Sequence, residues 1–222
     1  MYSIKEIFYT LQGEGAMAGR ASIFCRFSGC NLWTGQERHR QKAVCKFCDT
    51  DFIGTNGING NKYSAQDLAV FINNLWQENV NMGNAYPMCG KPYVVLTGGE
   101  PLLQVDEDLL KALHNFDFEI AIETNGTLEL VKGLDWICVS PKFGSTLKVF
   151  KGNELKVVYP QEFNLLDYEY FAKLDFDNFF IQAKDDKDKQ LAKINIQKAI
   201  EFCQKYPKWR LSTQTHKYLG IA

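Results

Sequence analysis

Short apolar runs rich in β-branched and aromatic residues recur along the chain, and most are separated by segments with apolar residues at helical spacing. The predicted strands span residues 21–27, 93–97, 118–124, 135–140, 155–159 and 178–182, with a further candidate at 209–213. The predicted helices span residues 64–76, 105–116 and 189–206. Ser64 and Asp67 form a capping-box pattern at the start of the first helix. This alternation indicates an α/β fold built on a parallel sheet or a barrel.

Polar or glycine-rich clusters follow the predicted strands, at the point where each strand ends. They are Ser28–Cys30, TGGEP at 97–101, ETNG at 123–126, SPK at 140–142, QAKD at 182–185 and STQTHK at 212–217. The carboxyl ends of parallel strands meet at one edge of an α/β sheet, and active sites form there. The sequence therefore predicts one large composite pocket at that edge.

Length, charge and hydropathy exclude several classes of protein. A chain of 222 residues fits one domain and can bury a core without help from a metal. The balance of 25 basic and 26 acidic residues, with no long run of like charge, argues against a surface for duplex nucleic acid. The first residues lack the apolar core of a signal peptide, and no apolar run is long enough to span a bilayer. We therefore expect a cytoplasmic protein that binds neither nucleic acid nor a membrane.

The cysteines predict metal chemistry. Their number, seven, is odd and the chain has no secretory features, so a disulfide framework is not expected. Cys30, Cys45 and Cys48 lie close together and could hold iron–sulfur, or zinc if a fourth ligand completes the site. Cys25 lies in an apolar strand and His39 in a charged segment, so both are weak candidates for that ligand. The cysteines interpreted as non-ligands are Cys89, Cys138 and Cys203.

Phe47, inside the Cys-x-x-Cys pair, and GGEP at 98–101 resemble the radical S-adenosylmethionine (SAM) superfamily. That superfamily usually spaces its cysteines Cys-x3-Cys-x2-Cys, whereas fourteen residues separate Cys30 from Cys45 here. The longer spacing, with motifs along nearly the whole chain, is similar to the 7-carboxy-7-deazaguanine synthase family. These motifs are TLQGEG, FCRFSGCNLW, CKFCDTDF, LTGGEPLLQ, IETNGT, SPK and RLSTQTHKYLGIA. The resemblance implies one radical SAM domain over residues 1–222, an α/β partial, modified TIM-type barrel with parallel strands and reduced helical content.

The resemblance also implies three cofactors. A [4Fe–4S] cluster would be held by Cys30, Cys45 and Cys48, and its fourth iron would bind SAM. Mg²⁺ would be bound through the Thr50 hydroxyl and substrate oxygens. The residues expected to contact SAM are Phe47, Cys48, Asp49, Gly99, Glu100, Glu123, Asn125, Ser140, Pro141, Lys142, Gln182, Ala183, Lys184 and Asp185. Ala183 stands where the family usually has proline.

A further set of residues is implied for the substrate. Glu14 and the residues before it would read the guanine-like edge of a pterin, and Arg26 would bind a substrate carboxylate with its guanidinium fork. The expected substrate-binding residues are Leu11, Gln12, Gly13, Glu14, Arg26, Thr97, His216 and Ala222. The loop 28–52 would carry the cluster, with its insertion at 31–44 as a wall or lid. The tail 209–222 would close the substrate site.

The activity implied by the resemblance is a carbon–nitrogen lyase reaction, conversion of 6-carboxy-5,6,7,8-tetrahydropterin to 7-carboxy-7-deazaguanine with loss of ammonia. It belongs to 7-deazapurine synthesis, such as that of tRNA queuosine. The expected partners are the pterin, an electron donor such as flavodoxin, and a second copy of the chain in a homodimer. Two alternatives are another radical SAM enzyme, such as an activase of a glycyl-radical enzyme, and a zinc-stabilised binding module.

Overall fold

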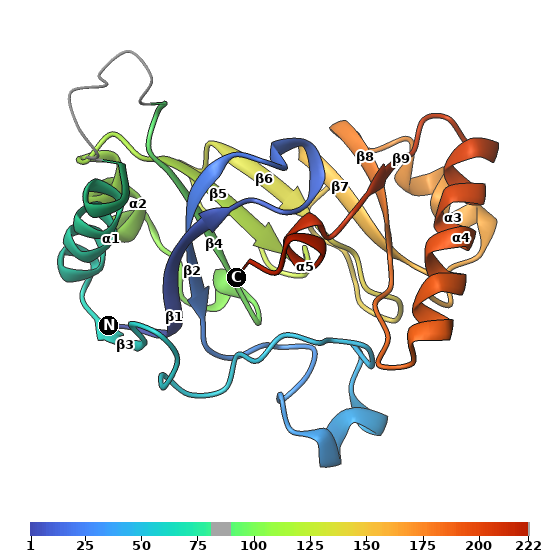
Figure 1. The fold of residues 1–222 in the computed structure, drawn as a ribbon, viewed down its shortest axis with the longest axis horizontal. Coiled ribbons are helices and arrows are strands. Elements are labelled where there is room, and N and C mark those ends of the chain that lie inside the picture. The colour runs from blue at the N-terminus through green and yellow to red at the C-terminus, as the bar shows by residue number, and fades with distance from the viewer. Residues whose placement is uncertain (81–89, 222) are drawn as a thin grey trace.

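The computed structural model describes residues 1–80 and 90–221, and its central feature is an open sheet of nine strands (Figure 1). The strands lie in the order β3-β1-β2-β4-β5-β6-β7-β8-β9. β2 and β4 to β9 run parallel, while β1 is antiparallel to both of its neighbours. The bounds are β1 Tyr2–Leu11, β2 Ala21–Phe27, β3 Asn61–Tyr63, β4 Tyr93–Gly98, β5 Glu119–Thr124, β6 Trp136–Val139, β7 Lys151–Tyr159, β8 Asp175–Ala183 and β9 Arg210–Ser212. The predicted α/β class and partial, unclosed barrel are confirmed.

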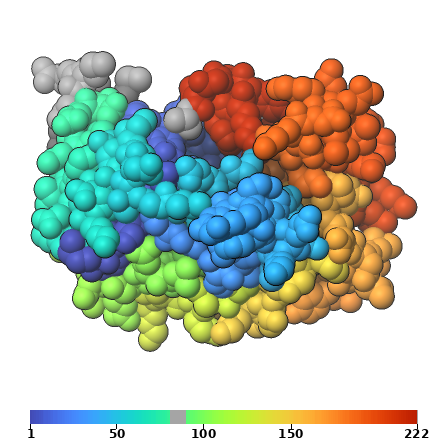
Figure 2. Space-filling model, turned by 90° about the horizontal axis from the view of Figure 1, so that it is seen from below, coloured from blue at the N-terminus to red at the C-terminus, as the bar shows by residue number. Residues whose placement is uncertain are grey.

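Helices cover the outer face of the sheet in two groups (Figure 1). α1 (Ala65–Val80) and α2 (Glu107–His114) pack on the β1–β5 half, and α3 (Leu165–Phe171) and α4 (Lys189–Lys205) pack on the other half. The short α5 (Thr215–Leu219) lies on the inner side, against the loop that follows β1. The described residues also form 3₁₀ turns at Gly15–Met17, Glu37–Lys42 and Pro101–Leu103. The loop 28–52 lies across the face of the molecule seen in Figure 2, where much of this loop is light blue.

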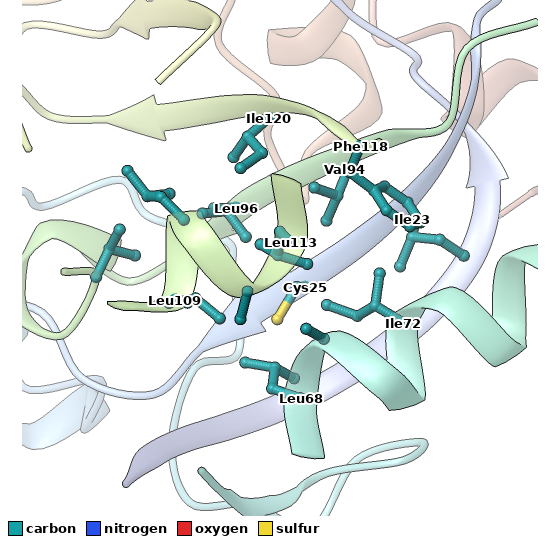
Figure 3. Packing of buried hydrophobic residues seen from close by; sticks show 14 of the residues in the cluster. Ile23, Cys25, Leu68, Ile72, Val94, Leu96, Leu109, Leu113, Phe118 and Ile120 are labelled. Atoms are coloured by element: carbon teal, nitrogen blue, oxygen red, sulfur yellow. The ribbon is translucent and has the colours of Figure 1, made fainter. Parts of the chain in front are cut away.

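Alternation along the strands separates an apolar core from a polar inner face. On β2, Cys25 and its apolar neighbours are buried against α1 and α2, as Figure 3 shows, whereas Arg26 lines a cavity on the other side. On β7, Leu155 and Val157 join the cluster under α3 and α4, while Lys156 lines the same cavity. Successive side chains of a strand point to opposite faces, so charged residues in these strands gather on the inner face.

Several elements differ from the predictions. β1 was not predicted, because a bulge between Ile4 and Glu6 shifts its register and breaks the apolar alternation. β3, α3 and α5 are also additional, and each is too short to show a period in the sequence. The predicted helix at 64–76 continues to Val80, while the Ser64 hydroxyl accepts the amide of Asp67 at 3.1 Å as its cap. The predicted strands and the other two helices are confirmed within a few residues.

Candidate active site

The carboxyl ends of the strands surround a cavity of about 460 Å³ on the inner side of the sheet. Residues from the end of β1, the loop 28–52, the loops after β4, β5, β6 and β8, and α5 line it. Among the residues that the structure describes, all predicted site residues line this cavity except Glu100 and Pro141. Two predicted residues, Cys89 as a non-ligand and Ala222 as a substrate contact, lie outside the described part of the chain.

Three free thiols face the cavity, those of Cys30, Cys45 and Cys48. The Cys45 thiol donates to Cys48, and this hydrogen bond lowers the pKa of Cys48 to about 6. Burial raises the pKa of Cys30. Iron and zinc bind cysteine as the thiolate. The hydrogen-bonded pair Cys45 and Cys48, with Cys30 at the same cavity, is therefore a donor set suited to a metal.

The two residues considered as a fourth zinc ligand lie elsewhere. Cys25 is fully buried between β2 and helices α1 and α2 (Figure 3). His39 lies in the Glu37–Lys42 turn with its Nδ1 2.9 Å from Thr34 Oγ1. Neither lines the cavity, whereas the described histidine that does, His216, has its ring against Gly13. This arrangement fits a three-thiolate cluster with an open iron better than a closed zinc site.

Two glycines bring the end of β4 against the cysteine loop. A Cβ at Gly98, whose φ is +131°, would lie 2.2 Å from the Phe27 carbonyl oxygen. A Cβ at Gly99 would lie 2.1 Å from the Gly29 carbonyl oxygen and 2.9 Å from Cys30 Cβ. Any side chain here would force the two segments apart, so glycine is required for the TGGEP turn to reach the thiols.

Glu100 has a position that the sequence did not predict. Its carboxylate is fully buried and accepts hydrogen bonds from the Leu102 amide at 3.0 Å, the Thr124 hydroxyl at 2.8 Å and the Asn125 amide at 2.8 Å. It therefore lies behind the cavity lining and holds the ETNG segment in place. Pro141 is also buried outside the lining, with its carbonyl accepting from the Gln161 side chain at 3.3 Å.

The ETNG and SPK segments reach the cavity through side chains that are bonded to neighbouring loops. The side-chain amide of Asn125 donates to Asn31 Oδ1 at 3.0 Å, which connects the end of β5 to the cluster loop. Lys142 Nζ donates to the Ser140 hydroxyl and carbonyl, both at 2.7 Å. Burial lowers the pKa of Lys142. Each segment thus presents a fixed polar group next to the cysteines.

The C-terminal region is bonded to two of the loops at the cavity. Lys217 Nζ on α5 lies 2.9 Å from the Asp49 carboxylate, next to Cys48, and 2.6 Å from that of Asp185, after β8. The Thr215 amide donates to the Gly13 carbonyl at 2.9 Å. Burial lowers the pKa of His216 and so favours its neutral ring. The segment 215–219, which could be taken for a loose tail, is a structured wall of the cavity.

The most buried charged group of the cavity is Lys156, on β7, whose side chain is only 4% exposed. Its Nζ lies 2.7 Å from Glu14 Oε2 and 3.0 Å from Glu123 Oε2. Burial alone would raise the pKa of Glu14, but the charge and hydrogen bond of Lys156 outweigh it and lower that pKa to about 2. Burial raises the pKa of Glu123, and the surrounding anionic groups raise that of Lys156.

A second charged pair lies at the β1–β2 side. Arg26 Nε donates to Glu6 Oε1 at 2.7 Å, so the terminal nitrogens are the part of its guanidinium fork left for a ligand. Lys5 lies 2.7 Å from Asp51, next to the predicted magnesium ligand Thr50. Thr97 lines the same region from the end of β4.

Several cavity residues were missed by the sequence reasoning. They are Lys5, Glu6, Phe8, Phe24, Leu32, Trp33, Asp51, Gly98, Thr124, Lys156, Val158, Gln214 and Lys217. For Lys156 a signal was present, because Glu154 and Lys156 occupy alternate positions beside the apolar residues Leu155 and Val157 and so share one face. Charges inside a buried strand require partners, and these lay in segments far away in the sequence.

Comparisons with known proteins agree with this geometry. The chain is 54% identical over 222 residues to the 7-carboxy-7-deazaguanine synthase of Burkholderia multivorans and 55% identical over 221 residues to that of Bradyrhizobium diazoefficiens, with 99% of each chain covered. The crystal structure of QueE from Escherichia coli matches with a TM-score of 0.68 at 27% identity, over 97% of this chain and 94% of that one. No family model matches the chain.

An open, mostly parallel α/β sheet with three free thiols at its carboxyl edge defines the class as radical SAM enzymes. The relatives that match it over nearly their whole length narrow the class further. The chain belongs to the 7-carboxy-7-deazaguanine synthase family.

Proposed function

We propose that the chain converts 6-carboxy-5,6,7,8-tetrahydropterin to 7-carboxy-7-deazaguanine with release of ammonia, as a carbon–nitrogen lyase of 7-deazapurine synthesis. The observation that carries the proposal is the meeting of three thiols and a buried carboxylate–lysine group at one cavity. Relatives more than 50% identical are named for this product, which supports the same reaction here.

The residues present fit a [4Fe–4S] cluster and SAM. Cys30, Cys45 and Cys48 supply three thiolates, and the glycines at 98–99 let the end of β4 pack directly against the cysteine loop. When bound, the cluster and SAM supply the radical that removes hydrogen from the substrate. The residues proposed to contact SAM are Phe47, Cys48, Asp49, Gly99, Glu123, Asn125, Ser140, Lys142, Gln182, Ala183, Lys184 and Asp185, all of which line the cavity.

The protein's own groups would bind the substrate and exclude water. Arg26, held by Glu6, would bind the substrate carboxylate with its terminal nitrogens. Leu11, Gln12, Gly13 and Glu14 at the end of β1, with Thr97 and His216, line the remaining surface. Ala222 is proposed to reach the substrate because the chain before it, at 215–219, already forms a wall of the cavity. A radical reaction needs a closed site, which α5 and the loop 28–52 would provide.

Further partners are part of the proposal. Mg²⁺ would bind the Thr50 hydroxyl and substrate oxygens, and would orient the substrate. An external one-electron donor such as flavodoxin would reduce the cluster, and two chains would form a homodimer. We propose that the whole of residues 1–222 acts as one domain in the cytoplasm. No helix within the described residues is long and apolar enough to span a membrane.

Product formation tests the function directly. Protein purified and reconstituted without oxygen, chemically reduced and given SAM, should convert the carboxytetrahydropterin to the deazaguanine, detected by mass spectrometry. An omission of Mg²⁺ should slow turnover. Iron-loaded protein that cleaves SAM but leaves the pterin unchanged would favour another radical SAM activity. Colourless, zinc-loaded protein would contradict both the proposed synthase activity and any other radical SAM activity.

A further inference from the structure

Lys156 is the one charged group in the described cavity that binds two carboxylates from different elements while being almost completely buried. Its Nζ contacts Glu14, in the loop after β1, and both oxygens of Glu123, on β5, at 2.7 to 3.2 Å. A buried ammonium with no solvent contact is costly unless it is paired. The ion pairs with Glu14 and Glu123 therefore fix the position of the Lys156 ammonium group.

Glu14 is held in place independently of Lys156. The backbone amides on either side of it are anchored, that of Gly15 to the Ser212 hydroxyl at 3.0 Å and that of Ala16 to the Glu154 carboxylate. The Gln214 amide donates to Glu14 Oε1 at 3.1 Å. The loop therefore keeps its shape if Lys156 is replaced. The expected effect of such a replacement is on the ionisation of the Glu14 carboxyl group, not on its position.

The same region contains a group of possible metal ligands, formed by Glu123, Cys138 and Glu154 within 4.8 Å of one another. The Lys156 ammonium already bonds Glu123, and the charges of Glu123, Glu14 and Glu154 raise its pKa. The lysine thus supplies the positive charge that a metal would supply. We assign no metal to this group.

Two carboxylates bound to one ammonium form a pair of adjacent acceptors. Without the ammonium they would repel each other, and a proton would bind to one of them. Each carboxylate retains lone pairs beyond those used by Lys156. Such a pair is matched by a planar ring edge with adjacent N–H donors, as on the 2-amino-4-oxopyrimidine ring of a pterin.

We propose that Lys156 is a positioning residue for the substrate: it holds the Glu14 and Glu123 carboxylates side by side at the cavity, so that they accept hydrogen bonds from the amino-pyrimidine edge. This inference rests on the proposed function, since it names what recognises the pterin ring, and it assigns Glu123 to the pterin rather than to SAM. Lys156 itself touches the carboxylates and acts through them.

The test compares two unreactive ligands that differ at that edge. The holoenzyme, with reconstituted cluster and SAM, is titrated calorimetrically with 6-carboxypterin and with 6-carboxylumazine, in which an oxo group replaces the 2-amino group. Wild-type protein should bind the pterin at least about tenfold more tightly, because a site built for an N–H donor rejects the analogue that lacks it. The Lys156→Met variant should lose most of this preference while keeping its affinity for SAM.

A pH series separates positioning from a merely structural role. The groups facing Lys156 are Glu14, Glu123, Glu154, Cys138 and, further away, Lys142 and His216. Between pH 6 and 7.5, the contribution of Glu14 to wild-type affinity for the carboxypterin should be nearly constant, since Lys156 lowers the pKa of Glu14 to about 2. In Lys156→Met the acids lose their cation and their pKa rises, so affinity should increase with pH. Loss that is equal for both ligands at every pH would contradict the proposal.

Matched variants cover the case in which Lys156→Met does not fold. Lys156→Arg keeps the charge and should retain the preference for the pterin. The double variant Glu123→Gln with Lys156→Met removes one charge of each sign and should fold but show little preference. Lys111→Met, at an exposed position on α2, should behave as wild type. Full preference in the double variant would overturn the proposal, whereas wild-type protein that binds neither ligand would overturn the proposed function itself.

Discussion

Replacing Glu100 tests whether this acid is a structural centre or a cofactor contact. The structure gives its carboxylate three donors, from Leu102, Thr124 and Asn125, all at 2.8 to 3.0 Å and without exposure to solvent. In Glu100→Gln one of the two oxygens becomes an amino group. Whichever way the amide turns, an N–H then faces a backbone N–H, and one donor loses its acceptor.

The cost follows from the burial of that donor. An unsatisfied buried donor costs about 1–3 kcal/mol, so the free energy of unfolding should fall by about that amount in Glu100→Gln. Glu100→Ala leaves three donors without acceptors and an empty space, and should cost at least about 3 kcal/mol. The ETNG segment should loosen, and SAM affinity should fall by less than tenfold in the glutamine variant.

Urea unfolding followed by circular dichroism measures the stability, and calorimetry measures SAM binding to the reconstituted protein. Glu107→Gln, in the exposed first turn of α2, is the matched control and should change neither quantity by much. Complete loss of SAM binding with an unchanged urea midpoint would refute this reasoning. That result would mean that Glu100 contacts the cofactor directly, as the sequence predicted.

Four further substitutions test other parts of the site. Cys30→Ala should abolish SAM cleavage and lower iron content, whereas Cys25→Ala should keep the iron and lose about 1–2 kcal/mol of stability from a small core cavity; equal iron loss in both would contradict the ligand assignment. Lys217→Met should change the unfolding free energy by less than about 1 kcal/mol, because its ion pairs are exposed, yet raise the KM for the pterin by loosening α5; an unchanged KM would remove this bridge from the site. The pKa of Glu14 is lowered to about 2, so its ion pair with Lys156 stabilises the fold fully above about pH 5 and less as the pH falls towards 2. Glu14→Gln should therefore destabilise the protein by up to about 3 kcal/mol at pH 7 and by progressively less in acid, measured by urea unfolding across pH; a constant difference would contradict the assignment.

The sequence predicted where the site lies because strand order alone brings certain residues together. Thr97, Glu123, Ser140 and Gln182 each lie at the carboxyl end of a parallel strand, and the fold places all four at one cavity. Those positions follow from local patterns, in which a polar cluster ends an apolar run.

Roles that depend on long-range contacts could not be predicted in the same way. Glu100 stands in a motif that suggested a cofactor contact, but its bonds to Thr124 and Asn125 depend on how two loops meet. Lys156 was within an apolar run, and only the folded chain places Glu14 opposite it. Strand β1 was hidden because its bulge broke the period on which the prediction relied. Local sequence patterns do not contain the hydrogen-bond partners that are distant in the sequence, and they do not reveal irregular backbone such as a bulge.

The central claim is that the protein supplies three thiolate ligands and leaves one iron of the cluster for SAM. Electron paramagnetic resonance of the reduced, reconstituted protein, with and without SAM, tests it most directly. The account predicts about four irons per chain and a cluster signal that changes when SAM is added, in wild type and Cys25→Ala alike. A signal that stays the same at saturating SAM would indicate a fourth ligand from the protein and would contradict it.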